Sequence, residues 1–568
     1  MSGGFCLLMA LVLTVNFAIA RNEDPLRSTE LKELRQKLQV TPADENIKQR
    51  IREMDLRLRE KYFRHLQGMC LGSYLLLAGV TAFLIAAGQA FRAERALPQL
   101  KVDAIDPNRA LASQARWSVM ATGGIVAALL LVLSLGPGRA FPKRPEDIEK
   151  LLANRTDTVA AADYALADEI ALNWPRLFGP DGNGSHGLAT APTAWDAKTG
   201  QGVAWKIPMP VPGFNSPIVW NDRVFLSGGD AAERSVLCLD GKTGRVLWQK
   251  AVTKGAAGVV ATGSPEIPES TGYAASTMAT DGKRVFVIFA TGDLAAFDLN
   301  GEILWSKCLG PLKNTYGHAS SLLTWKGRLF AQVDQGESDQ GKSRLYAFDG
   351  RSGEVLWEQS RSVGSSWSTP TLIESGGKTQ IITLAVPRVN GYAAETGAEL
   401  WRVEGINGEA TPSPIAGAGL VFAISPSEKL MAIRPDGHGD VTKTHVVWSS
   451  EENVPDITTP ATDGDLLFTV STGGSLTCYD AKDGKKQWAH EFDTEFHASP
   501  GIAGKALYLF SEKGQAIVVE VARQFKELFR TEMPDSFSAS PAFAQENIYL
   551  RGATNLWCIG PVRGQLAR

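Results

Sequence analysis

The sequence predicts an all-β propeller of eight four-stranded blades over residues 194–562, preceded by an α-helical membrane-anchoring region. Two different markers each recur eight times along the C-terminal two-thirds of the 568 residues. Two long, uncharged apolar stretches lie upstream of them. Successive copies of the first marker lie 40 to 57 residues apart, a period typical of propeller blades with four short strands.

The first marker is a tight turn that ends in an aromatic residue, as in LDGKTGRVLW at 239–248. Its glycine allows a positive φ between the last two strands of a blade, and its aromatic ring offers a large flat surface to bury against the next blade. We expect the tryptophans at this position to dock neighbouring blades. The aromatic positions are Trp205, Trp248, Trp305, Trp357, Trp401, Trp448, Trp488 and, in the eighth copy, Phe529.

The second marker is a triplet of small residues that opens a new strand. The inner strands of a propeller converge on a narrow axis, where bulky side chains would collide. A proline at the first position of a strand also blunts unwanted pairing, because it lacks the donor. The triplets begin at Asn215, Ala275, Ala319, Ser368, Ala410, Thr458, Ala498 and Ala539.

The two ends of the repeat array are complementary. The array ends in the strand-like NLWCIG (555–560) with no turn after it, and it begins with AWDAKTGQGVAW (194–205), a turn and strand with no blade before it. We therefore expect the strand at 203–207 to complete the blade formed by 540–559. That pairing would join the two ends and remove an exposed sheet edge.

Composition excludes some classes of function. The formal net charge of −3 predicts no nucleic-acid partner. The six cysteines form no C-x-x-C or Cys-Cys pair, and Cys238, Cys478 and Cys558 recur at one position of the repeat. We interpret these three as small buried apolar residues rather than ligands.

The N-terminal region is directed to a membrane. Residues 1–20 are uncharged, largely apolar and end in A-x-A, which predicts a signal peptide, with an uncleaved signal anchor as the alternative. Residues 68–91 and 117–138 contain no charged residue, and each exceeds the ~20 residues that a helix needs to span a bilayer. We expect two transmembrane helices, because every backbone group in lipid must be satisfied internally.

The segments between these stretches complete the domain organisation. Residues 21–67 are predicted as a helical hairpin, 92–116 as a loop and 139–193 as a linker and lead-in. Lys and Arg residues near the spans barely distinguish the two orientations. The signal-like start favours an exported propeller, and an N-terminus outside the membrane would invert this arrangement.

The repeat Y/F-D-x-x-T/S-G-x-x-x-W resembles the tryptophan-docking repeat of the pyrroloquinoline quinone (PQQ)-like eight-bladed propellers over about 194–562. The lead-in NWPRLFGPDGNG (173–184) is similar to the W-P-x-F-R-G-P-x-G-x-G opening of exported bacterial members, with Leu177-Phe178 in place of Phe-Arg. That group includes quinoprotein alcohol dehydrogenases and the assembly lipoprotein BamB. The resemblance implies the fold, but it covers both enzymes and non-enzymes.

The resemblance also implies what an enzyme of this group would require. A quinoprotein dehydrogenase would need PQQ, a bound Ca²⁺ and a carboxylate base, and relatives carry a disulfide between adjacent cysteines over the quinone. This chain has neither Cys-Cys nor the C-x-x-C-H haem motif. We expect no cofactor and assign no catalytic or metal-binding residue; PQQ and calcium are implied by the resemblance alone.

The candidate binding residues lie where the inner strands begin. Two positions before the hydroxyl residue of each triplet, the blades present Phe214, Ala274, His318, Trp367, Glu409, Ile457, His497 and Ser538. Three from consecutive blades, His318, Trp367 and Glu409, are predicted to form an arc that suits a peptide or small ligand. His497 is expected across the channel from His318, too far away for the two to share a metal ion.

These features predict a protein of the bacterial inner membrane that displays its propeller in the periplasm. The expected role is a BamB-like scaffold that binds a protein or peptide of the cell envelope. Two alternatives stay open: a PQQ-dependent dehydrogenase, and a sensor in which the propeller binds a ligand and the helices relay the signal.

Overall fold

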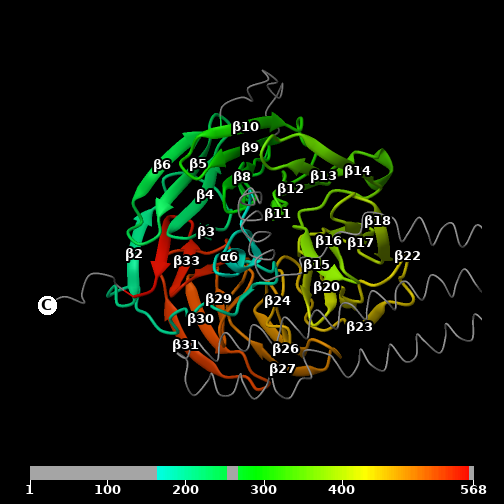
Figure 1. Cartoon of the computed structure of the whole chain (residues 1–568). Helices are drawn as coiled ribbons and strands as arrows, with labels where there is room; N and C mark the ends of the chain where they lie inside the picture. Colours follow the sequence, from blue (N-terminus) through cyan, green and yellow to red (C-terminus); the bar gives the residue numbers. More distant parts are fainter. Residues whose placement is uncertain (1–162, 253–266, 562–568) are drawn as a thin grey trace, which may run out of the picture. The chain divides into compact units, whose positions relative to one another are not determined.

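A computed structural model describes residues 163–252 and 267–561. Eight β-sheets surround a central axis as the blades of a propeller (Figure 1). The predicted all-β, eight-bladed fold of four-stranded blades is therefore confirmed. The predicted signal sequence, hairpin and membrane spans lie outside the described residues. Within the described ranges, no helix is long and apolar enough to cross a membrane.

The first four blades follow one another along the chain. Blade 1 consists of β3 (Ile218–Trp220), β4 (Arg223–Gly229), β5 (Arg234–Asp240) and β6 (Val246–Ala251). Blade 2 consists of β7 (Ala279–Thr280), β8 (Arg284–Ile288), β9 (Asp293–Asp298) and β10 (Ile303–Cys308). Blade 3 consists of β11 (Leu323–Trp325), β12 (Arg328–Val333), β13 (Ser343–Asp349) and β14 (Val355–Arg361). Blade 4 consists of β15 (Thr371–Ser375), β16 (Lys378–Ala385), β17 (Arg388–Ala393), β18 (Glu399–Glu404) and an added fifth strand, β22 (Gly439–Asp440).

The other four blades complete the circle. Blade 5 consists of β19 (Ile415–Gly417), β20 (Leu420–Ser425), β21 (Lys429–Ile433) and β23 (Val446–Ser450). Blade 6 consists of β24 (Ala461–Thr462), β25 (Leu466–Val470), β26 (Ser475–Asp480) and β27 (Lys486–Glu491). Blade 7 consists of β28 (Gly501–Ala503), β29 (Ala506–Phe510), β30 (Gln515–Glu520), β31 (Glu527–Glu532) and, on its inner edge, β1 (Ser185–His186). Blade 8 consists of β32 (Ala542–Ala544), β33 (Asn547–Arg551), β34 (Asn555–Ile559) and β2 (Val203–Pro208). The short helices are α6 (Ala167–Ala171) and the 3-10 helix η2 (Ser338–Gln340).

Blade 8 joins the two ends of the array, as predicted. β2 pairs antiparallel with β34, from Val203 opposite Ile559 to Pro208 opposite Asn555. The N-terminal strand therefore supplies the outer edge of the blade that the C-terminal strands begin (Figure 1). This pairing closes the circle with main-chain hydrogen bonds, so that no blade is left incomplete.

A ring of hydroxyl groups links the eight inner strands around the axis. One Ser or Thr of each blade donates its backbone N–H to the side-chain oxygen of the equivalent residue in the next blade, at 2.9–3.1 Å. The last member donates to the first, so the ring is closed. Its members are Ser216, Thr277, Ser321, Thr369, Ser413, Thr459, Ser499 and Ser540.

The ring corrects the alignment of three blades. Two positions before the ring residue stand Ala275, Ala319 and Thr411, where the sequence predicted Ala274, His318 and Glu409. Blades 2 and 3 have two adjacent hydroxyl residues at this point, and blade 5 has two hydroxyl–proline pairs in TPSP (411–414). Either hydroxyl of such a pair satisfies the sequence pattern, but only one reaches the neighbouring blade.

We predict that Ser413→Ala destabilises the propeller by about 1–3 kcal/mol, because it leaves the buried N–H of Thr369 without an acceptor. The matched control is Thr411→Ala, since the Thr411 hydroxyl bonds only the carbonyl of Glu409 within its own loop. Denaturant unfolding of both variants measures the difference. Equal losses would contradict the ring alignment.

Five of the predicted docking tryptophans share one geometry. Their indole N–H donates at 2.9–3.2 Å to a backbone carbonyl in the turn of the next blade. The rings of Trp205, Trp248, Trp305 and Trp448 also cover a positive-φ glycine of that blade; a Cβ on Gly244, for example, would lie 2.7 Å from the ring of Trp205. The eighth turn has no glycine, and there Trp488 packs edge-to-face against Phe525. Trp357 covers Gly397 in the same way, but its Nε1 has no hydrogen-bond partner among the described residues. The five are Trp205, Trp248, Trp305, Trp448 and Trp488.

Trp401 departs from this geometry. It is fully buried, and its Nε1 donates at 2.7 Å to Oε1 of Gln380 in its own blade. Gly391 lies opposite it on β17, and a Cβ there would lie 2.4 Å from the indole. At this blade junction the next turn is replaced by a longer segment, whose strand β22 pairs parallel with β18. The indole therefore packs within blade 4 rather than on a turn of blade 5.

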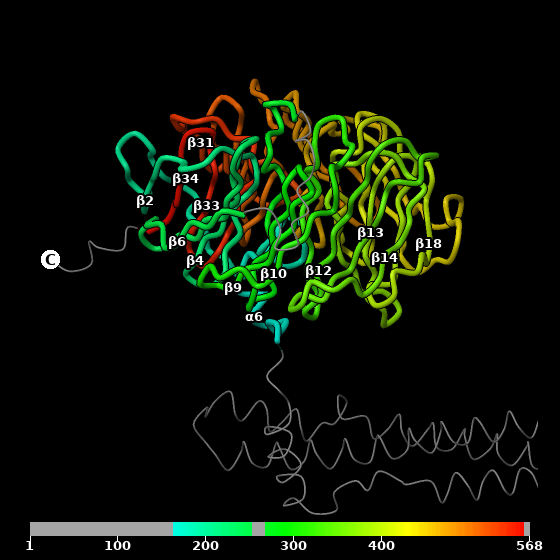
Figure 2. The backbone as a smooth tube through the Cα atoms, turned by 90° about the horizontal axis from the view of Figure 1, so that it is seen from above, coloured from blue at the N-terminus to red at the C-terminus, as the bar shows by residue number. Residues whose placement is uncertain are grey.

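The lead-in segment occupies one end of the channel. The Trp174 and Val219 backbones exchange hydrogen bonds at 2.8 and 3.0 Å, and the Thr280 N–H donates to the carbonyl of Pro175 at 2.8 Å. The Ile502 N–H donates to the carbonyl of Gly184 at 2.7 Å. These inner-strand residues each lie three positions beyond the hydroxyl ring. The segment therefore pairs with the inner edges of several blades, and α6 projects from this end (Figure 2).

Candidate binding site at the open mouth

The connections that lead into the inner strands meet at the end of the channel opposite the lead-in. Each inner strand starts at the hydroxyl ring and runs towards the lead-in segment. The residues just before the ring therefore surround the other mouth, which we call the open mouth. Phe214 and Ile457, both two positions before the ring, are 39% and 37% exposed.

Three aromatic and acidic side chains form a preorganised cluster at the open mouth, which we call the aromatic–acid site. Tyr316 and Trp367 lie with ring centroids 5.2 Å apart at an interplanar angle of 52°. The Tyr316 hydroxyl donates at 2.9 Å to Oε1 of Glu409, and the Trp367 indole donates at 3.1 Å to the carbonyl of Gly317. Three successive inter-blade connections are thereby tied together.

Only two of the three residues predicted to form an arc lie together in the structure. Trp367 and Glu409 belong to the aromatic–acid site, whereas His318 is only 2% exposed and lies behind it. Burial lowers the pKa of His318 to about 4, so the imidazole is neutral at physiological pH. The sequence pattern placed His318 at the mouth because it took Ser320, and not Ser321, as the ring residue. Tyr316 takes its place in the cluster, and an aromatic residue in this loop was the signal that could have identified it.

His497 faces an acidic partner at another part of the open mouth. Its Nδ1 lies 3.0 Å from Oε1 of Glu512. The Ser538 hydroxyl donates to the same oxygen at 2.7 Å, and the Ser536 hydroxyl donates to Oε2 at 3.0 Å. The bond to His497 is the main cause that lowers the pKa of Glu512 to about 2, and the same bond raises the pKa of His497. The sequence predicted His497 at this mouth but not its carboxylate partner.

This pair predicts a pH dependence of stability. The contribution of His497 is fully present below its ordinary pKa of 6.5 and is lost as the pH rises through its raised pKa. The contribution of Glu512 is present above its ordinary pKa of 4.5 and is lost as the pH falls towards about 2. We expect His497→Gln to lower the melting temperature more at pH 5.5 than at pH 9. The same change at the exposed His438 is the control, and equal effects at both pH values for His497→Gln would refute the pairing.

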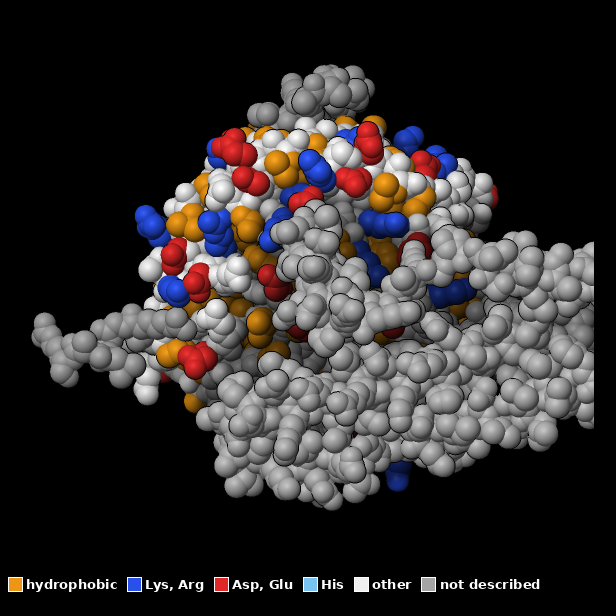
Figure 3. Space-filling view, in the orientation of Figure 1, with side chains coloured by type: hydrophobic (Ala, Val, Ile, Leu, Met, Phe, Trp, Pro, Cys, Tyr) orange, Lys and Arg blue, Asp and Glu red, His pale blue; other side chains and the backbone are white. Residues whose placement is uncertain are grey.

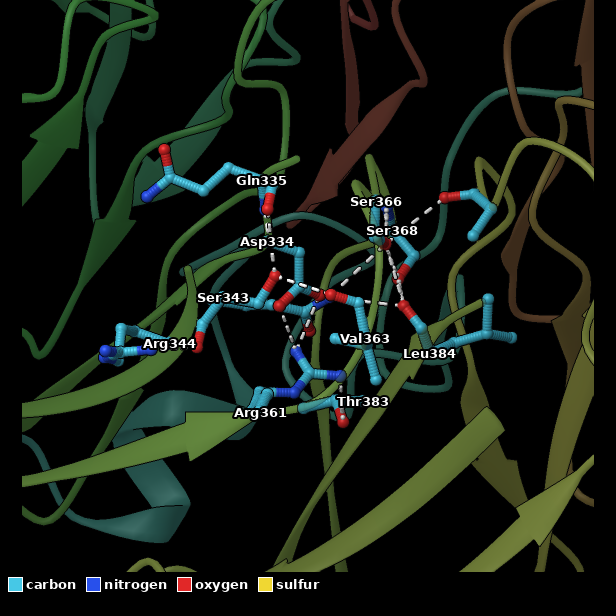
Figure 4. A network of polar contacts seen from close by, with 12 residues as sticks. Asp334, Gln335, Ser343, Arg344, Arg361, Val363, Ser366, Ser368, Thr383 and Leu384 are labelled. Carbon is cyan, nitrogen blue, oxygen red and sulfur yellow. Dashed lines mark hydrogen bonds and ion pairs between the residues drawn. The ribbon is translucent and has the colours of Figure 1, made fainter. Parts of the chain in front are cut away.

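A buried ion pair lies in a polar network between blades 3 and 4 (Figure 4). Nη1 of Arg361 lies 2.7 and 2.8 Å from the two carboxylate oxygens of Asp334, and both side chains are 0% exposed. Gln332 donates to the same carboxylate at 2.8 Å, and Arg361 donates to the Thr383 hydroxyl of blade 4 at 3.0 Å. The network therefore fixes blade 3 against blade 4. No sequence pattern marked either charged residue.

The described residues do not provide an evident site for a metal-dependent quinone. They contain no group of three or more His, Cys, Asp or Glu side chains placed to hold a metal ion. Calcium takes six to eight oxygen ligands. At the open mouth, Glu409 and Glu512 are bonded to Tyr316 and His497 and lie in separate clusters. The described residues therefore do not match the ligand set that a calcium–quinone pair requires.

The fold defines a class of protein, the eight-bladed propellers with tryptophan-docked blades. The family model described as outer membrane protein assembly factor BamB matches residues 188–337, 341–438 and 388–566. These matches cover more than half of the chain, which therefore belongs to this family. A search of curated proteins finds no match.

Solved structures show the same fold at low identity. BamB from Moraxella catarrhalis is 16% identical, with 62% of this chain and 98% of that chain covered and a TM-score of 0.45. Quinohemoprotein alcohol dehydrogenase from Comamonas testosteroni is 12% identical, with 73% and 86% covered and a TM-score of 0.53. The quinohemoprotein alcohol dehydrogenase ADHIIG from Pseudomonas putida HK5 is also 12% identical, with 71% and 82% covered and a TM-score of 0.50. The similarities to the two alcohol dehydrogenases show the fold alone.

Proposed function

We propose that this protein is a binding scaffold of the bacterial cell envelope, whose open mouth receives a protein or peptide. We further propose that the N-terminal region anchors it in the inner membrane and that the propeller is periplasmic. Membership of the BamB family supports a role in binding other proteins. The uncharged stretches at 68–91 and 117–138 support the anchor.

The observation that carries this proposal is the difference between the two ends of the channel. The lead-in occupies one end with main-chain pairing. Both ends carry exposed apolar side chains, such as Leu188 in the lead-in, but those at the open mouth lie on separate blades around the axis. These are Phe214, Tyr316 and Ile457, each 37–39% exposed. Apolar side chains arranged around the mouth of a channel are candidates for contact with a partner. Acidic, basic and hydrophobic side chains are interspersed on the visible parts of the face shown in Figure 3.

Site-specific photo-crosslinking tests this proposal in living cells. A photoreactive phenylalanine analogue is placed at position 214 or 457, and at Leu188, which is 64% exposed in the lead-in segment. We expect light-dependent protein adducts from the two mouth positions and none from position 188. The proposal fails if neither mouth position gives an adduct, or if all three positions give the same pattern.

The competing function is quinone-dependent oxidation, and it has a direct test. The full-length protein is titrated with PQQ in the presence of Ca²⁺, followed by absorbance and by dye-linked alcohol oxidation. We expect neither stoichiometric uptake nor turnover, because the described residues do not supply a metal-ligand cluster. Stoichiometric uptake accompanied by turnover would overturn the scaffold proposal.

A further inference from the structure

The aromatic–acid site combines two features that recognise a positive charge. The faces of two aromatic rings attract a cation through their quadrupoles, and Tyr316 and Trp367 hold such rings 5.2 Å apart. A carboxylate lies beside them, because Tyr316 bonds Oε1 of Glu409 at 2.9 Å. Phenol and carboxylate are thus fixed relative to each other before any ligand arrives.

The carboxylate of Glu409 is exposed and has no ion-pair partner among the described residues. The Tyr316 hydroxyl occupies one direction at Oε1, and the other carboxylate oxygen has no hydrogen-bond partner in the described part of the chain. An ionised carboxylate accepts about four hydrogen bonds. Glu409 therefore retains acceptor capacity for an ammonium or guanidinium group.

The open mouth as a whole is acidic, although the three connections that form the site itself carry only Glu409 and Lys313. The connections that lead into the eight inner strands contain eight Asp or Glu residues and one Lys within their described parts. The acidic residues are Glu269, Glu409, Glu451, Glu452, Asp456, Asp493, Glu495 and Asp535, and the basic residue is Lys313. Such an excess of one sign around an opening draws in ligands of the opposite sign.

We propose that the aromatic–acid site receives a lysine or arginine side chain from a positively charged segment of the partner protein. The aliphatic stem would contact Trp367, and the charged group would bond Glu409. This inference rests on the proposed binding function and adds the chemistry of the ligand. An acidic segment would meet repulsion from the same mouth, which gives the site a sign preference.

Matched peptides test the sign preference directly. Three fluorescent twelve-residue peptides share Gly, Ser, Leu and Phe positions and differ in two central residues, which are Lys-Arg, Gln-Gln or Glu-Glu. Binding to the full-length protein in mild detergent is followed by fluorescence anisotropy at low salt and at high salt. We expect the Lys-Arg peptide to bind at least tenfold more tightly than the Gln-Gln peptide, and the Glu-Glu peptide to bind most weakly.

Two variants test whether Glu409 is responsible for the preference for the Lys-Arg peptide. Glu409→Gln is expected to remove most of the tenfold preference for the Lys-Arg peptide over the Gln-Gln peptide. Glu354→Gln makes the same charge change in a turn between β13 and β14, away from the open mouth, and should leave all three affinities unchanged. Thermal unfolding confirms that both variants are folded.

The outcomes separate this inference from the scaffold proposal. Equal binding of the Lys-Arg and Gln-Gln peptides, or a preference that survives Glu409→Gln, would overturn the cationic ligand and leave the scaffold intact. Absence of binding by the Lys-Arg peptide would also overturn the inference of a cationic ligand. The scaffold itself is tested separately, by the cross-linking and PQQ experiments described above.

Discussion

Asp334→Ala is expected to destabilise the propeller by about 3–5 kcal/mol, because it leaves a buried guanidinium without its counter-charge. Asp334 and Arg361 are both 0% exposed, and the carboxylate is the only acidic group bonded to this arginine among the described residues. Arg361 cannot deprotonate to relieve the charge. The loss should appear in denaturant unfolding and should displace the loop that follows β12.

Removing both charges distinguishes two quantities: the cost of leaving Arg361 buried without its counter-charge, and the net contribution of the ion pair to the free energy of unfolding. The double variant Asp334→Leu with Arg361→Met should recover most of the lost stability, since replacing a buried ion pair by apolar residues is often neutral. An exposed pair provides the control: Lys242 and Asp222 lie 2.6 Å apart with side chains about half exposed. Asp222→Ala should cost less than about 1 kcal/mol. Similar losses for Asp334→Ala and Asp222→Ala would contradict this account.

Features that repeat were predictable from the sequence. The number of blades followed from two markers that agree, and the closure by β2 followed from a strand missing at one end of the array. The three recurrent cysteines are buried in the structure, as expected for small apolar residues, and Cys238 and Cys478 lie directly opposite Trp248 and Trp488 on the neighbouring strand. A position that serves the same packing role in every blade leaves a pattern.

Features that occur once were not predictable in the same way. The partner of Arg361 is 27 residues away along the chain, and the partner of Tyr316 is 93 residues away. The first distance is shorter than one repeat, and the second spans two repeats, so neither contact recurs between successive blades. The ring alignment failed for a different reason: adjacent hydroxyl residues such as Ser320 and Ser321 are chemically equivalent, and only strand geometry decides which one reaches the next blade.

The second large effect is expected at Trp401, where the repeat is broken. Trp401→Ala removes a fully buried indole and should cost about 3–5 kcal/mol. Trp401→Phe keeps most of the ring but leaves Oε1 of Gln380 without its donor, which adds about 1–3 kcal/mol. Gln380 also donates at 2.9 Å to the carbonyl of Pro435. The side chain therefore links Trp401 to the segment that replaces the usual turn of blade 5.

Trp357 provides the matched comparison. It stands at the same position of the preceding blade and covers Gly397, but its Nε1 has no partner in the described structure. Trp357→Phe removes no hydrogen bond from this network, so it should cost less than Trp401→Phe in the same denaturant assay. Combining Trp401→Phe with Gln380→Leu should cost less than the sum of the single losses, because the two side chains bond each other. Strict additivity, or equal costs for the two Phe variants, would show that burial rather than the Gln380 bond determines the role of Trp401.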